Sequence, residues 1–182
     1  PPGVISPGVP IAGVQVGGLT RAAAREAVLA QYIAPRRAKV PVTFRGRTLA
    51  IDPVTTGYTA DVDYALDGAL LFGRSKPLPP EGVTVPLRQK VDRKRLRAVL
   101  SLRAAKYDLP AKDASLSFNG ATPVVSKPRV GVAIDVSKAA TAVEQAILVR
   151  DRPVYPLPSK RVRPAVTSAG PAIIIERNAY RL

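Results

Sequence analysis

An internal repeat is the feature that most constrains how this chain can fold. Both halves contain, in the same order, a Phe-x-Gly turn, a glycine 13 residues after the phenylalanine, and an aspartate four residues after that glycine. Several matched spacings in one order indicate a duplicated unit. We therefore predict an α+β fold made of two related helix-strand-strand-helix repeats packed as small α/β modules. The matched positions are Phe44, Gly46, Gly57, Asp61 and Arg74 in the first half, and Phe118, Gly120, Gly131, Asp135 and Arg150 in the second.

Capping residues and apolar periodicity divide each repeat into two helices and a strand pair. The expected caps are Thr20, Asp61 or Asp63, Asp92 and Asp135. Helices are predicted over 21–33, from the second cap to Gly73, over 93–107, and from 136 through 147. Strands are predicted at 11–16, 40–44, 48–51, 83–87, 114–118 and 123–126. The two strand pairs are joined by Arg45-Gly46-Arg47 and by Asn119-Gly120, and Asn-Gly is a strong hairpin signal.

The Gly-x-x-x-Asp element starts the last helix of each repeat. Glycine allows a permissive backbone at the bend, and aspartate accepts from the free N–H groups at the helix start. Because Asp61 and Asp135 lie in separate repeats, we interpret the element as structural and not as an acid/base pair.

Shifts in composition along the chain predict five segments. An extended N-terminal segment covers 1–18, the repeats cover 19–76 and 83–150, a Pro-rich basic linker covers 151–171, and an apolar run opens the segment 172–182. No apolar run approaches the roughly 20 residues that a membrane-spanning helix needs.

The composition excludes several classes of function. The 182 residues include no Cys and no His, so thiol or imidazole catalysis and disulfides are excluded, and we expect no active site, metal or cofactor in this chain. The formal net charge of +15 favours an anionic partner.

Basic side chains concentrate on the helix predicted at 93–107. Residues 81–110 contain eight basic and three acidic side chains, and Arg93 and Arg97 lie one turn apart. One interpretation is a solvated helix face; the other is a docking surface for a carboxylate or phosphate polymer, with Arg93 and Arg97 as its main contacts. Further candidate contacts are Arg45, Arg47, Tyr58, Arg74 and Arg129.

Nucleic-acid binding is supported by charge alone. Aromatic residues are not interleaved with the basic ones, and no Gly-rich phosphate loop is present, so we expect no specific nucleic-acid partner.

Three stretches resemble a known family. The opening PGVPIAGVQVGGLTRAAAREAV looks like the segment before peptidoglycan-binding domains of VanW-like proteins and actinobacterial L,D-transpeptidases. Residues 49–74 are similar to that domain's own signature, in which a strand and a Gly four residues before an Asp lead into an Ala-rich helix ending in Gly-Arg. AIIIERNAYRL, at 172–182, resembles the first strand of the YkuD-type L,D-transpeptidase catalytic domain.

The resemblance implies an extracytoplasmic, non-catalytic module of a membrane-anchored L,D-transpeptidase-like protein. Such a module would hold peptidoglycan or another anionic wall polymer near a catalytic domain in cis. That catalytic domain uses Cys and His, which this chain lacks, so no catalytic residue is carried over. The alternative is a structural spacer, or a cover for the catalytic domain, with no ligand of its own.

Overall fold

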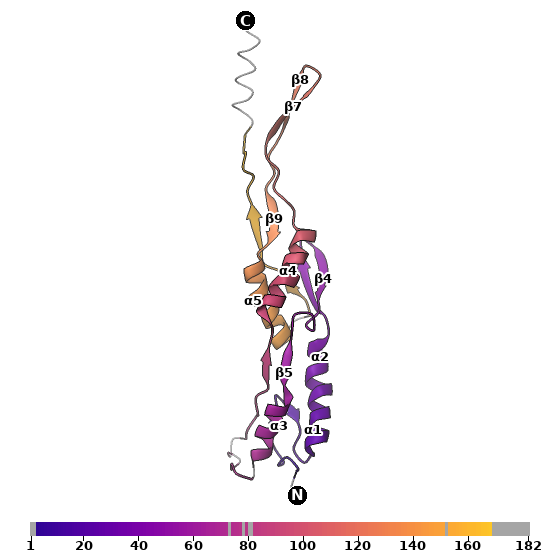
Figure 1. Ribbon diagram of the computed structural model, residues 1–182, viewed down its shortest axis with the longest axis vertical. Helices are drawn as coiled ribbons and strands as arrows, with labels where there is room; N and C mark the ends of the chain where they lie inside the picture. Colours follow the sequence, from indigo (N-terminus) through magenta and orange to yellow (C-terminus); the bar gives the residue numbers. More distant parts are fainter. Residues whose placement is uncertain (1–2, 73, 78, 80–81, 152, 169–182) are drawn as a thin grey trace.

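The molecule is drawn out along one axis, with its N-terminal helices at one end and a two-stranded hairpin at the other (Figure 1). The computed structural model describes residues 3–72, 74–77, 79, 82–151 and 153–168. The segment predicted at 172–182, and Gly73 as a helix end, lie outside the described residues.

Helices and small sheets alternate along the chain, which confirms the α+β class. The helices are α1 (Arg21–Val28), η1 (Leu29–Ile33), α2 (Ala34–Arg37), α3 (Val62–Leu71), α4 (Arg93–Tyr107) and α5 (Val136–Val149). The strands are β1 (Pro10–Ile11), β2 (Val14–Gln15), β3 (Val40–Phe44), β4 (Arg47–Ile51), β5 (Thr59–Asp61), β6 (Arg88–Lys90), β7 (Ser115–Asn119), β8 (Thr122–Ser126), β9 (Gly131–Ile134), β10 (Tyr155–Pro156) and β11 (Ser159–Val162).

Side-chain caps start the four main helices. Thr20 accepts from the backbone N–H of the residue three positions on, as do Asp61 and Asp135, while Asp92 accepts from two N–H groups of α4. These contacts satisfy N–H groups that have no partner inside the helix. The predicted caps are confirmed, and of the two alternatives for α3 it is Asp61 that accepts.

The first helical segment continues past its predicted end near Ile33. A five-residue π-helical turn, η1, follows α1, and α2 then runs to Arg37. Pro35 sits in the first turn of α2, directly after the π-helical turn, and the chain stays helical there. The prediction was wrong here because it treated Pro35 as a helix terminator.

The hairpin β3–β4 forms at the predicted place. Its turn residues, Arg45 and Gly46, have φ of 50° and 73°, the left-handed pair that a two-residue hairpin turn requires. On the other edge of β3, β10 pairs in parallel, so that the sheet order is β10-β3-β4. β11 pairs antiparallel with β9. Part of the segment 151–171, predicted as a linker, is thus built into the fold.

Two hydrophobic cores divide the molecule, and their boundaries cut across the two predicted repeats. The N-terminal core is formed by buried residues from 5–33 and 62–87. The central core is formed by buried residues from 40–58 and 91–157. Strands β3 and β4, from the first predicted repeat, therefore pack with α4 and α5 from the second, and the chain passes between the cores at 34–39, at β5 and at β6. The boundaries 19–76 and 83–150 remain a prediction about sequence units.

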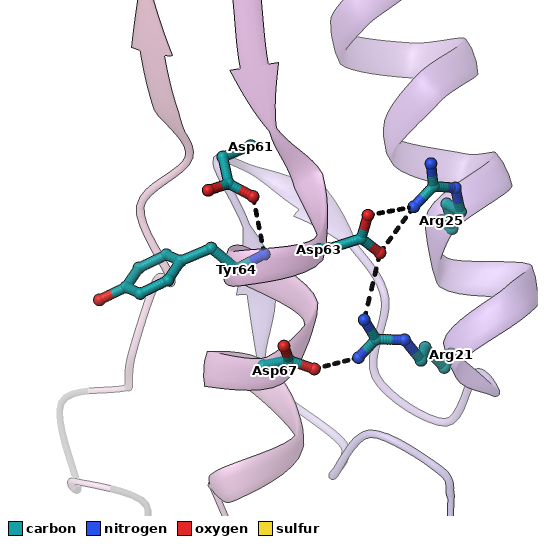
Figure 2. A network of polar contacts seen from close by, with 6 residues as sticks. All are labelled: Arg21, Arg25, Asp61, Asp63, Tyr64 and Asp67. Atoms are coloured by element: carbon teal, nitrogen blue, oxygen red, sulfur yellow. Dashed lines mark hydrogen bonds and ion pairs between the residues drawn. The ribbon is translucent and has the colours of Figure 1, made fainter.

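A polar network on the surface joins α1 to α3 (Figure 2). Arg21 bonds to both Asp63 and Asp67, and the Nη1 of Arg25 lies 2.6 Å from the Oδ1 of Asp63. The two helices of the N-terminal core are thus paired by charge as well as by apolar packing.

The ionised carboxylate of Asp63 should make the free energy of unfolding depend on pH, and an asparagine at this position would remove that dependence. The hydrogen bond from Arg25, together with the nearby charges of Arg25 and Arg21, lowers the pKa of Asp63 below its ordinary value. A carboxylate whose pKa is lower in the folded state stabilises the fold above its ordinary pKa of about 4, and this contribution is lost as the pH falls through the lower folded value.

When the pH falls from neutral to about 3, we therefore expect the free energy of unfolding to decrease more in the wild type than in the Asp63→Asn variant. Urea unfolding of both proteins at the two pH values measures the difference. Equal losses in both proteins would show that the network carries no pH-dependent stability.

Candidate functional site

A basic groove runs between the β3–β4 hairpin and α4. It consists of two hollows of about 430 and 290 Å³, both lined by Tyr107. The larger one lies over β4 and the loop that follows it, and the smaller one lies at the hairpin turn. The lining residues are Lys39, Phe44, Arg45, Arg47, Thr48, Leu49, Ala50, Asp52, Thr55, Val99, Arg103, Lys106, Tyr107 and Asp108.

Packing of α4 against the central core sets the geometry of the groove. Leu96 and Leu100 are fully buried and fix which face of α4 points inward. Arg103 then reaches the backbone oxygen of Ala50 in β4, at 3.3 Å. At the other end, Arg45 donates to the backbone oxygen of Tyr107 at 3.4 Å. The hairpin and the helix are therefore bound to each other at both ends of the groove.

The groove carries a positive charge that its own acids do not neutralise. Five cations line it: Lys39, Arg45, Arg47, Arg103 and Lys106. Across the described part of the chain, no ion pair involves any of the five. The Oδ1 atoms of Asp52 and Asp108 accept instead from the backbone N–H groups of Val54 and Ile134. The cations remain available to an anion from outside.

The predicted contacts on α4 lie on the other flank of the helix. Arg93 donates through Nε to Glu144 of α5, at 2.9 Å. Arg97, one turn further on, is exposed on the same flank. The structure thus brings Arg45 and Arg47 together in the groove but not with Arg93 and Arg97, and Glu144 neutralises part of the charge on Arg93.

The other predicted contacts are scattered. Tyr58 is only 5% exposed, burial raises its pKa, and its hydroxyl donates to Gln89 at 2.8 Å. Gln89 in turn donates to the hydroxyl of Tyr32, so that Tyr58 belongs to a polar link beside β5 and β6. Arg74 follows α3 near the N-terminal end of the molecule, whereas Arg129 precedes β9 toward the opposite end (Figure 1).

Sequence reasoning did not single out several groove residues. Arg103 and Lys106 counted only toward the charge of the basic helix, and Lys39 was not considered. The available signal was the spacing of Val99, Arg103 and Lys106, which places them along one flank of a helix. The fold adds what spacing cannot supply, namely that β4 covers this flank.

The arrangement suits the binding of an anion. Arg and Lys side chains hold carboxylates and phosphates, and a guanidinium does so through two parallel hydrogen bonds. In the described part of the chain, no group of three acidic side chains could hold a metal ion. Nor does any helix there combine the length and apolar character needed to cross a bilayer.

The α+β fold thus presents an exposed cationic groove that suits an anionic ligand. The sequence matches the family described as "Putative peptidoglycan binding domain" over residues 49–155, more than half of the chain. The chain belongs to this family. No curated protein and no solved structure matches it.

Proposed function

We propose that this chain binds the peptidoglycan of the cell wall through the basic groove. Membership of a peptidoglycan-binding family supports peptidoglycan as the ligand. The five cations of the groove, which form no ion pair within the described residues, support the groove as the binding site. The cations in the groove are the observation that carries the proposal, because an uncompensated positive cleft attracts and retains anionic ligands.

The chemistry of the wall fits this surface. Peptide stems and secondary wall polymers carry carboxylates and phosphates, which arginine recognises bidentately. Arg45 lies in the hairpin turn and Arg47 directly follows it, and Lys106 of α4 lines the same smaller hollow. A polymer lying along the groove would meet cations from two elements.

We further propose that the chain is a module of an exported protein and positions a downstream catalytic domain on the wall. The resemblance of the opening segment to that of VanW-like proteins and actinobacterial L,D-transpeptidases supports this context. In this proposal the protein is extracytoplasmic and reaches the membrane only through an anchor elsewhere in its parent.

Reversal of charge in the groove should abolish retention on the wall. We expect Arg45→Glu/Arg47→Glu/Lys106→Glu to reduce the fraction bound to purified sacculi about tenfold or more at near-physiological salt. Retention of the wild type should fall as salt rises, because exposed charges are screened. Co-sedimentation with sacculi over a salt series measures both effects, and circular dichroism checks that the variants are folded.

A matched control separates the groove from net charge. Arg74→Glu/Lys127→Glu/Arg129→Glu makes the same change in charge at exposed positions outside the groove, and we expect it to lower retention less than about twofold. Arg93→Glu/Arg97→Glu tests the other flank of α4. Equal losses in all three variants would count against a site in the groove.

A structural spacer is the second candidate, and the elongated outline of the molecule favours it (Figure 1). A spacer predicts no retention of the wild type on sacculi at any salt concentration. The same co-sedimentation series therefore decides between the two.

A further inference from the structure

The hairpin β7–β8 presents an apolar face that nothing in the described structure covers. Its register places Leu116 opposite Val125 and Phe118 opposite Pro123, so these four side chains share one face. Phe118 is 50% exposed and Val125 46%. Within the described residues, the hairpin forms a sheet of its own. A lone two-stranded hairpin is marginally stable in water, so an apolar face of this kind needs a partner.

The equivalent hairpin of the first half shows what a covered face looks like. Phe44 and Val42 of β3 correspond in order to Phe118 and Leu116 of β7, and both are buried in the central core. Their cover comes from α4 and α5, which follow later in the chain. A hairpin in this fold is therefore completed by chain that comes after it.

The chain that follows β11 already returns to the base of the β7–β8 hairpin. The N–H of Ala114 donates to the backbone oxygen of Val166 at 2.9 Å. The Oδ1 of Asp113 accepts from the N–H groups of Ala165 and Val166, at 2.6 and 3.1 Å. The described chain after β11 thus lies next to the base of the hairpin (Figure 1).

Two other hairpins accept a later segment in the same manner. Val85 pairs in parallel with Ile11 of β1, and β10 pairs in parallel with β3. In both cases the returning segment lies along the first strand of the hairpin. The contact between Val166 and Ala114 places a returning segment beside the start of β7, which is again the first strand.

We propose that the apolar face of β7–β8 is a docking surface for residues 172–182 of the same chain, through the apolar run Ile173–Ile175. Ile173 is seven positions after Val166, and this stretch spans up to about 24 Å when extended, whereas a five-residue strand is about 17 Å long. The run can thus reach the whole face. A second copy of the chain is a poorer occupant, because a net charge of +15 on each molecule opposes association. This inference does not rest on wall binding.

Disulfide trapping tests the docking without interference, because the chain has no cysteine of its own. Val125→Cys is combined in turn with Ile173→Cys, Ile174→Cys and Ile175→Cys in the full 182-residue chain. A disulfide forms only when the two Cβ atoms come within about 4.5 Å. We expect at least one pair to form an intramolecular disulfide under mild oxidation, as read by non-reducing gels and peptide mass mapping.

The control uses the neighbouring residue on the opposite face of the same strand. Val124→Cys has almost the same exposure and distance along the chain as Val125→Cys, so tethering alone gives both positions a similar effective concentration. Docking predicts disulfide formation about tenfold or more faster at Val125. Equal rates at both positions would overturn the proposal, and so would disulfides formed only between molecules, which would assign the face to a second copy.

Discussion

Replacement of Leu100 by Ala is expected to destabilise the protein by about 2 to 5 kcal/mol. Leu100 is fully buried at the centre of the face that α4 turns toward β3, β4 and α5. Truncation removes apolar contacts and leaves a space that the surrounding side chains fill only in part, since protein cores are close-packed. At roughly 2 to 4 °C per kcal/mol for a chain of this size, the midpoint of thermal unfolding should fall by about 4 to 20 °C.

The control for this prediction lies on the same helix. Leu102 is 73% exposed, and Leu102→Ala should change the free energy of unfolding by less than about 0.5 kcal/mol. Calorimetry of the three proteins gives the comparison. Because the chain passes between the two cores at three places, we also expect a single unfolding transition in each protein. Similar midpoints for Leu100→Ala and Leu102→Ala would contradict the packing described for the central core.

Replacement of Gly131 by Ala is expected to cost about 3 kcal/mol or more, a large effect for a single added methyl group. A Cβ at this position would lie 2.4 Å from the backbone nitrogen of Ala111 and 2.4 Å from the backbone oxygen of Leu109. Both are main-chain atoms, so the loop that follows α4 must move. That movement would break the paired hydrogen bonds, each 2.8 Å long, between Leu109 and Val132.

Gly120 supplies the control, because this position needs a left-handed backbone but has open space around it. It has a φ of 64° and nothing within 4 Å of an added Cβ, so Gly120→Ala pays only for a left-handed backbone, about 1 kcal/mol. Chemical denaturation of both variants measures the difference. A smaller loss for Gly131→Ala than for Gly120→Ala would show that the loop at 109–111 yields easily.

The helix caps and hairpins could be predicted from the sequence because their causes are local. A side chain that accepts from an N–H three positions on, as Asp61 does, needs no information from the rest of the chain. The Gly-x-x-x-Asp element was predicted in the same way, but the space that its two glycines leave free was not. Gly57 has a φ of 71°, as expected for a permissive bend, and an added Cβ there would also lie 2.8 Å from the Cβ of Asp92. Gly131 is required for space beside a loop that is distant in sequence.

Pairing between distant segments could not be predicted from local signals. Tyr155 and Leu157 lie in a Pro-rich stretch with the composition of a linker, yet both are buried in the central core. Their burial depends on pairing with β3, more than 100 residues earlier, and on packing against the rest of the central core. The site shows the same limit. Arg45 and Arg47 were candidates by type, but their proximity to Lys106 depends on the packing of α4 across the hairpin.

Because the two cores are interleaved along the chain, the residues that match the family do not coincide with a segment that could fold by itself. The family match begins at residue 49, inside β4, and ends at residue 155, the first residue of β10. A fragment with these ends would contain β4 without β3, and α3 without α1. No single cleavage point yields two self-sufficient halves. The sequence unit that the family match defines and the folding units that the two cores define are therefore offset from each other.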